Sequence, residues 1–228
     1  MYRVIGILAL ALIAVGCGAP APRSPAPADS LPGTAGPAAA AYRIDSAHSE
    51  LRVLVYRAGL LASFGHNHVI VNRGVEGSVN FAGNPATASF ALSIPANGFV
   101  VDDPKARSEE GADFAEETPE DAKEGTRHNM LGPSVLDVAE HPSIDVRSVA
   151  IRPAGAGLAA TISVTVAGHA STFVVPFTLD LSQGRLTASG ALSIRQSSLG
   201  LTPLSVMLGG LRVQDELTLK FRLVASAG

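Results

Sequence analysis

The feature that most constrains the fold of this chain is an alternation of apolar and polar residues with a period of two. Between residues 173 and 181 every second residue is large and apolar, and the same holds between residues 217 and 223. Residues i and i+2 of a β-strand point to the same face, so the pattern is typical of antiparallel strands with one buried face. Turn signals separate these segments, and residues 182–185 (SQGR) predict a hairpin between two long strands. The sequence therefore predicts an all-β domain, either a sandwich or a closed barrel.

One stretch interrupts this pattern. Residues 102–124 hold ten of the twenty acidic residues of the chain. Thr118, followed by Pro119 and two acids, is typical of a helix start with Thr118 as the capping residue. We expect a helix over about residues 119–130 and a second short turn over residues 134–139, within a helical insertion of about residues 102–140. We expect the acidic side chains to be solvated rather than to gather around a cation.

The N-terminal segment is typical of an export signal. A basic start at residues 1–3 precedes an apolar run over residues 4–15, and Gly16-Cys17-Gly18 follows. The run is shorter than the about 20 residues of a membrane span. Residues 14–17 resemble a bacterial lipobox, in which the cysteine is acylated, so Cys17 is the predicted lipid attachment site. Cys17 is the only cysteine of the chain and cannot form an internal disulfide. The alternative is an ordinary signal peptide with an incidental cysteine.

The segment that follows is predicted to be a tether. Residues 18–41 are rich in Pro, Ala, Gly and Ser and hold too little apolar surface to offset the entropy of ordering. With residues 1–17 as a lipoprotein signal peptide, we expect a lipid-anchored protein of the bacterial cell envelope that faces the periplasm or the exterior. Gly18, in place of an Asp after the cysteine, favours the outer membrane in a Gram-negative organism.

The remaining residues, 42–226, have a length that suits one domain. The net charge of −3 and the pI of about 6.1 show no excess of basic residues, so a nucleic-acid partner is not expected.

Several segments of this domain, in order, resemble motifs of the YceI-like family. Residues 42–49 (YRIDSAHS) resemble its opening strand, residues 127–131 (RHNML) its helix end, and residues 136–148 the run that follows. Residues 160–177 resemble its hairpin, and residues 199–203 and 213–217 its last two strands. The resemblance implies an eight-stranded antiparallel, lipocalin-like barrel with a helical insertion. It also implies a pocket for a long isoprenoid or another amphiphilic lipid, such as a polyprenyl quinone, in a periplasmic or secreted protein.

An apolar barrel interior suits a prenyl tail, and an eight-stranded barrel can enclose one ligand. The alternation alone leaves open which face points inward and whether the barrel is hollow or packed. The expected cavity residues are Phe64, Val69, Phe90, Leu92, Phe173, Val175, Phe177, Leu192 and Ile194. Residues 64–70 (FGHNHVI) depart from the basic, apolar stretch that family members often carry there, which leaves the identity of the ligand open.

Two histidines within that departure form a candidate metal site. His66 and His68 are two residues apart, so on a strand they would point to one side and could bind a divalent metal such as Zn or Cu. The third ligand would be His128 or His48. The alternative is that His66 and His68 form hydrogen bonds at the barrel mouth or fix the turn after Gly65.

Catalysis is not expected, because the sequence holds neither a Gly-x-Ser-x-Gly elbow nor a phosphate-binding loop, and no cofactor is required. The leading hypothesis is an exported, lipid-anchored binding protein that holds or carries an isoprenoid or other amphiphilic lipid. The alternatives are a metal-binding envelope protein that uses His66 and His68, and a ligand-free structural or interaction lipoprotein. The oligomeric state stays open.

Overall fold

A computed structural model describes residues 40–228 of the chain. The predicted signal peptide, Cys17 and the tether up to residue 39 lie outside the described residues. The described residues, 40–228, form one compact unit. No helix in the described part of the chain is long and apolar enough to cross a membrane.

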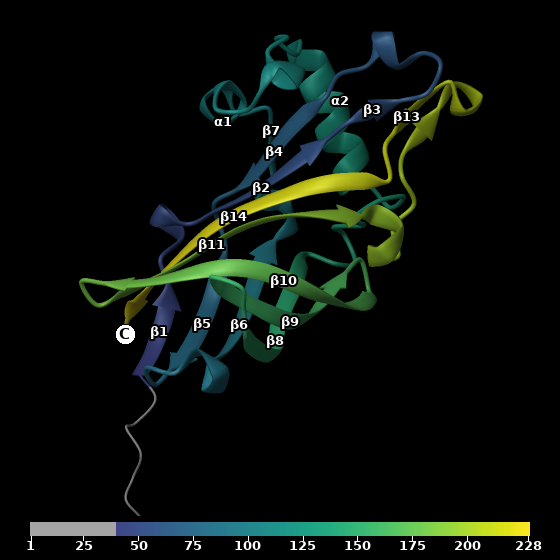
Figure 1. The fold of residues 1–228 in the computed structure, drawn as a ribbon. Coiled ribbons are helices and arrows are strands. Elements are labelled where there is room, and N and C mark those ends of the chain that lie inside the picture. Colours follow the sequence, from purple (N-terminus) through teal and green to yellow (C-terminus); the bar gives the residue numbers. More distant parts are fainter. Residues whose placement is uncertain (1–39) are drawn as a thin grey trace, which may run out of the picture. The chain divides into compact units, whose positions relative to one another are not determined.

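The centre of the fold is a closed barrel of eight antiparallel strands (Figure 1). In order around the barrel they are β1 (Ala40–Ile44), β5 (Glu76–Phe81), β6 (Ser89–Pro95), β8 (Ser143–Ala154), β9 (Gly157–Val166), β10 (His169–Ser182), β11 (Arg185–Arg195) and β14 (Glu216–Ala227). The barrel closes because β1 pairs with β5 on one side and with β14 on the other. The eight-stranded barrel predicted from the family resemblance is therefore confirmed. Since Ala40 and Ala41 pair with β5, the first strand begins two residues before the predicted boundary at residue 42.

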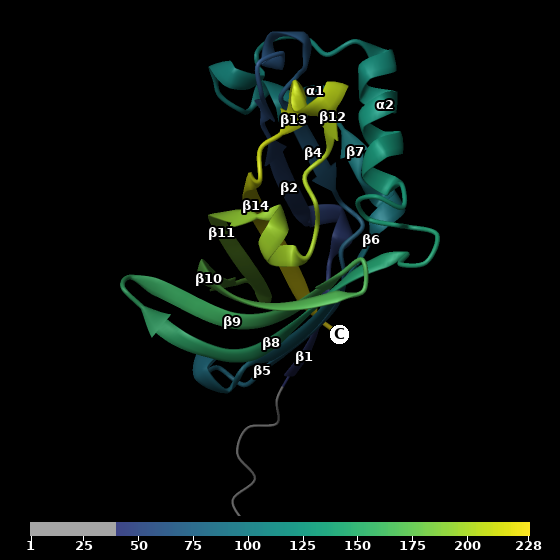
Figure 2. The same cartoon turned by 90° about the vertical axis from the view of Figure 1, so that its right-hand side faces the viewer.

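A short sheet branches from the barrel wall at β14. The C-terminal part of β14 pairs with β1, whereas its residues 218–222 pair with β2 (Glu50–Val55). β2 in turn pairs with β4 (His68–Asn72), and β4 with β7 (Val100–Val101), so these strands extend beyond the barrel (Figures 1 and 2). At the break between β1 and β2, the Ser49 hydroxyl accepts a hydrogen bond from the Val224 N–H at 2.9 Å, which satisfies a donor that has no strand partner there.

Tight turns join the long barrel strands. Gln183 and Gly184, between β10 and β11, have φ values of 51° and 72°. Positive φ at both central residues is the geometry of the two-residue turn that matches the twist of a hairpin. The hairpin predicted at residues 182–185 is confirmed.

The acidic insertion folds as α1 (Pro104–Ser108) and α2 (Glu120–Leu131). The α2 bounds agree with the helix predicted over residues 119–130, and residues 133–140 form turns. The predicted cap is wrong. Pro119 occupies the capping position, and Thr118 is buried with its hydroxyl unbonded within residues 40–228. Figure 2 shows α2 standing beside β7.

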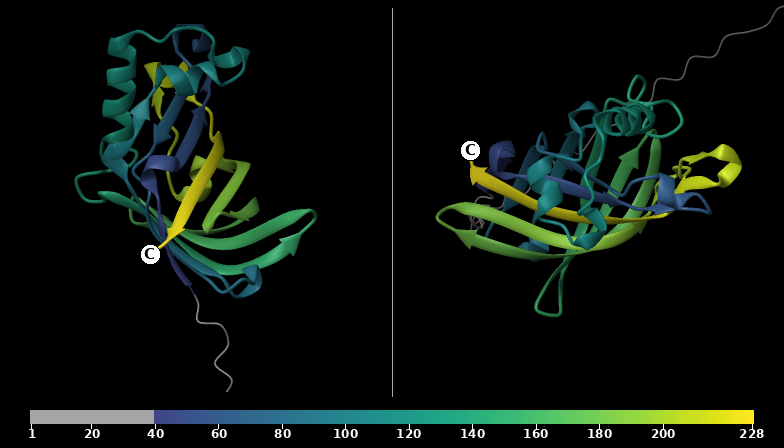
Figure 3. Two further views of the ribbon diagram at one scale, coloured as in Figure 1. Left: turned by 90° about the vertical axis from the view of Figure 1, so that its left-hand side faces the viewer. Right: turned by 90° about the horizontal axis from the view of Figure 1, so that it is seen from above.

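A separate, three-stranded sheet lies at the end of the molecule where β2 and β4 extend. It contains β12 (Ser205–Val206), β13 (Leu211–Val213) and β3 (Arg57–Ala58), and Figure 3 shows its loops projecting from the domain. These strands place residues 57–65 next to residues 205–213.

Candidate ligand-binding cavity

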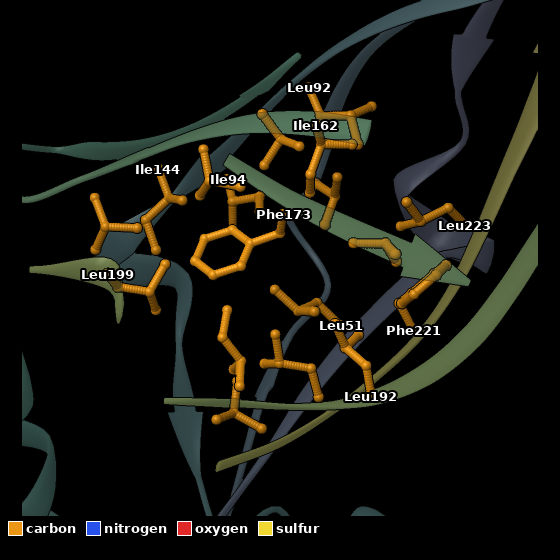
Figure 4. Close-up of a pocket in the computed structure, with 18 of the residues that line it drawn as sticks. Leu51, Leu92, Ile94, Ile144, Ile162, Phe173, Leu192, Leu199, Phe221 and Leu223 are labelled. Atoms are coloured by element: carbon orange, nitrogen blue, oxygen red, sulfur yellow. The ribbon is translucent and has the colours of Figure 1, made fainter. Parts of the chain in front are cut away.

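The interior of the barrel is hollow. A cavity of about 400 Å³ runs through it, within the range of small-molecule sites. Of the 45 residues that line it, three are polar (Thr126, Asn129 and Gln196), and none of these described residues is charged. Figure 4 shows branched aliphatic side chains from several strands pointing into this space, with the Phe173 ring among them.

The alternating pattern of the strands creates this lining. Along β11 the residues of one parity (Leu186, Ala188, Leu192 and Ile194) line the cavity, whereas Ala191, of the other parity, is exposed. Seven predicted cavity residues lie in the lining: Phe90, Leu92, Phe173, Val175, Phe177, Leu192 and Ile194. They come from β6, β10 and β11.

Two predicted cavity residues lie elsewhere, which corrects the sequence-based expectation. Phe64 is 76% exposed in a loop outside the barrel. Val69 is fully buried, but in a second core with Phe114 on the outer side of β4. Because α1 and its neighbours cover that outer side, every residue of β4 is buried and alternation cannot identify the inward face. Ile70, the neighbour of Val69, lines the cavity instead.

Sequence reasoning missed several lining residues. Ile144 and Ile162 come from β8 and β9, and Phe221 and Leu223 come from β14. The sequence of β14 shows the period of two, so assigning one face of that strand to the barrel interior would have identified Phe221 and Leu223. Phe221 also depends on Gly190, because a Cβ at that position would lie 2.6 Å from the Phe221 ring.

At the α2 end of the cavity lies a polar group, here called the Asp102 cluster: Asp102, His68, Arg107 and Thr126. The Asp102 carboxylate accepts hydrogen bonds from His68 Nδ1 at 2.8 Å, from the Val69 N–H at 2.8 Å and from Arg107 Nη1 at 2.7 Å. His68 Nε2 lies 3.1 Å from Thr126 Oγ1, and Thr126 lines the cavity. Because the Asp102 carboxylate can only accept, His68 Nδ1 is the donor of that bond, whereas either atom could donate between His68 Nε2 and Thr126 Oγ1.

The other histidines lie apart from this cluster or beside it. The His66 and His68 ring centroids are 6.3 Å apart, and both nitrogens of His68 are hydrogen bonded. His66 Nδ1 is buried without a partner among the described residues. His128 is exposed on α2, and His48 bonds Asp45 at 2.8 Å. Within residues 40–228 no three His, Cys, Asp or Glu side chains are grouped as metal ligands.

Several acidic residues of the insertion attach it to the strands rather than face solvent. Asp102 is 2% exposed, and Glu110 bonds Arg52 of β2 at 2.8 Å and also Lys220 of β14. Asp103 accepts from the Ala106 N–H at 2.9 Å and pairs with Arg73. The expectation of a solvated acidic run is therefore wrong for these residues.

The same contacts lower three carboxylate pKa values. Burial raises the pKa of Asp102, but the hydrogen bonds from His68 and Val69 and the charge of Arg107 outweigh it, and the net direction is downward. The N–H of Ala106 and the Arg73 guanidinium lower the pKa of Asp103. Burial of Glu110 is likewise outweighed by Lys220 and Arg52, so its pKa is lowered.

These shifts predict a loss of stability in acid. Each carboxylate has a lower pKa in the folded than in the unfolded chain, so the unfolded chain binds protons first as the pH falls. We expect the free energy of unfolding to fall as the pH drops below 4.5, the ordinary pKa of Glu, and further as the folded-state pKa values are passed. Urea unfolding between about pH 6 and pH 3 measures this slope, and Glu110→Gln is expected to make it shallower. Equal stability across that range would contradict the attachment of the insertion through these carboxylates.

Comparison with known proteins agrees with the fold. No curated protein matches the chain. The crystal structure of Burkholderia cenocepacia BcnA superimposes with a TM-score of 0.57 at 21% identity, covering 80% of this chain and 99% of BcnA. A polyisoprenoid binding domain from Saccharophagus degradans, implicated in plant cell wall breakdown, gives a TM-score of 0.54 at 14% identity, covering 83% of this chain and 99% of that domain. The model of the YceI-like domain matches residues 42–225, and the chain therefore belongs to the YceI-like family.

Proposed function

We propose that this protein is an exported, lipid-anchored binding protein that holds or carries an uncharged isoprenoid, or a related amphiphilic lipid, in its barrel. The observation that carries the proposal is the cavity lining, in which 42 of 45 residues are apolar and none is charged. The lining extends from Phe81 and Ala225 at the β1 end to Leu204 and Val213 near β13, which suits a long aliphatic chain. The family and the polyisoprenoid binding domain of Saccharophagus degradans support this class of ligand.

The polar side chains of the lining suggest which head group is held. Thr126 and Asn129 lie one turn apart on α2, and Gln196 is already bonded to the Gln214 carbonyl at 2.7 Å. If Thr126 donates to His68, its oxygen can still accept a hydrogen bond from a ligand hydroxyl, and the Asn129 amide can donate or accept. Neither residue offers a positive charge. A neutral head group therefore suits this end of the cavity better than a diphosphate.

The charges on α2 also favour a neutral head group. On that helix Lys123 pairs with Glu120, and Asp121 and Glu124 outnumber the remaining Arg127, so the helix offers no surplus of positive charge to an anionic head group. Export and lipid anchoring rest on the sequence pattern of residues 1–17 and on the single cysteine, Cys17.

A head-group series tests the proposal. A polyprenyl alcohol, a polyprenyl quinone and a polyprenyl diphosphate with chains of equal length are each titrated against the protein in competition with a fluorescent lipid. We expect the alcohol and the quinone to bind at least about tenfold more tightly than the diphosphate, because the diphosphate must lose hydration without a cationic partner. Equal or tighter binding of the diphosphate would contradict the neutral head group. Failure of all three lipids to bind would contradict the proposed function itself and favour a ligand-free role.

A further inference from the structure

Two neighbouring loops carry large apolar side chains into solvent at one end of the domain. Leu60 and Leu208 are almost fully exposed, Phe64 is 76% and Met207 68% exposed, and these four residues are here called the apolar tip. Leu60 and Phe64 follow β3, and Met207 and Leu208 lie between β12 and β13. In Figure 1 this tip is at the upper right, whereas β1, where the described chain begins, lies at the lower end. Isolated exposed apolar residues are ordinary, but a cluster on adjacent loops indicates a binding surface.

The tip is held in place rather than left as loose loops. The Leu61 N–H donates to the Gly210 carbonyl at 2.8 Å, and β13 pairs with β3. A Cβ at Gly59 would lie 2.4 Å from the Gly210 oxygen, so the two loops are in close contact. Met207 and Leu208 have φ values of 52° and 54°, which are unfavourable for residues with large side chains. Such a backbone conformation persists only where its surroundings enforce it, and here the backbone directs both side chains to solvent.

The charge around the tip suits an anionic lipid surface. Residues 57–68 and 201–214, which carry the tip, contain no Asp or Glu. Asp215 and Glu216 follow directly after the second segment, and the Asp215 carboxylate is bonded to Ser197. These segments carry Arg57 and the exposed Arg212. The nearest acid to Arg57 in an ion pair is Glu116, at 3.9 Å and on the insertion. Apolar side chains beside basic ones are the combination that binds to the interface of a membrane with anionic lipids.

The tip is also continuous with the cavity. Leu204 and Val213, at the base of the β12–β13 segment, both line the cavity, and the Val213 N–H donates to the Leu204 carbonyl at 2.9 Å. From these facts we propose that the apolar tip inserts into the surface of a lipid bilayer that contains anionic lipid, and that it brings the adjacent end of the cavity to the membrane. Insertion of the tip into a bilayer does not depend on the proposed function. The exchange of a lipid ligand between the membrane and the adjacent end of the cavity does rest on it.

The chain contains no tryptophan, so a single introduced indole reports on the tip alone. In the full chain we would place it by Phe64→Trp, a conservative change at an exposed site, and by Val174→Trp as the control. Val174 is 65% exposed on β10 of the barrel wall. Each variant is mixed with vesicles of phosphatidylcholine and phosphatidylglycerol, with or without bromine atoms on the acyl chains, since bromine quenches indole emission only at close range.

We expect the emission of Phe64→Trp to move to shorter wavelength with vesicles and to be quenched by brominated lipid, and the emission of Val174→Trp to do neither. Adding Leu208→Ser or Arg212→Gln to Phe64→Trp should reduce the quenching, and urea unfolding checks that these variants stay folded. Quenching of Phe64→Trp no greater than that of Val174→Trp would overturn the proposal. A shift that needs no vesicles and grows with protein concentration would also overturn it, because the tip would then bind a second copy. The head-group series reports on the cavity alone, so failure of ligand binding and failure of tip insertion are distinguishable.

Discussion

Ala188→Phe is expected to weaken binding of an isoprenoid by about 100-fold without loss of stability. Ala188 lies on β11 and lines the cavity, so the new ring enters space that the lipid tail would occupy. Displacing about four or five methylene-sized groups from apolar surroundings costs about 3–4 kcal/mol, which is at least about 100-fold in Kd. Because the ring fills a void in the ligand-free protein, the free energy of unfolding should stay the same or rise.

The matched control is Ala191→Phe, the same change three residues further along the same strand. Ala191 is exposed on the outer face, opposite Lys220 of β14, so its replacement should change neither lipid affinity nor stability much. Competition binding and urea unfolding of the two variants give both quantities. A barrel that is packed solid would give the reverse result: Ala188→Phe would lose about 1–3 kcal/mol of stability through overpacking, with no affinity to lose.

Asp102→Ala is expected to lower the free energy of unfolding by about 3–5 kcal/mol, the usual cost of removing one partner of a buried ion pair. The substitution leaves the Arg107 guanidinium, 10% exposed, without its carboxylate, and leaves His68 Nδ1 without an acceptor. It also places Ala at a φ of 54°, a region that Asn and Asp tolerate better than Ala.

Asp102→Asn separates these causes, because the amide keeps a tolerated backbone residue and loses only the charge. We expect an intermediate loss for it. Glu109→Ala is the control on the same insertion, since Glu109 also pairs with arginine but is 47% exposed, and solvent screening leaves such a surface pair with little effect on stability. Equal, small losses for Asp102→Ala and Glu109→Ala in urea unfolding would contradict the structural role of the Asp102 cluster.

The sequence was most informative where one face of a strand is buried. Phe173, Val175 and Phe177 alternate with more exposed residues on β10, and the period of two is enough to place them on one face of the strand. The hairpin turn at Gln183-Gly184 was also predictable, because few residue pairs adopt positive φ at both positions. The closed barrel itself needed the family resemblance, since alternation fits a sandwich equally well.

The sequence was least informative where tertiary contacts cover both faces of a strand or override the local preference of a residue for a helix cap or for solvent. Val69 alternates like a cavity residue, but β4 leaves the barrel and its outer face packs against Phe114. Thr118 has the side chain of a helix cap, yet Pro119 takes that position. The sequence predicts Asp102 and Glu110 to be solvated, because nothing local identifies their partners. Asp102 pairs with Arg107, and Glu110 with Arg52 and Lys220, only once the insertion has folded against the strands.

The most direct test of the lipid-binding barrel is native mass spectrometry of residues 40–228, the compact unit without the predicted attachment site Cys17. The domain is exported in its own host and purified without detergent, and the same sample is extracted with organic solvent. The cavity lining predicts a discrete added mass that extracts as an uncharged prenyl lipid, at one molecule for each chain. A bare mass, or an added mass that organic solvent does not extract, would contradict the proposal that the barrel holds such a lipid.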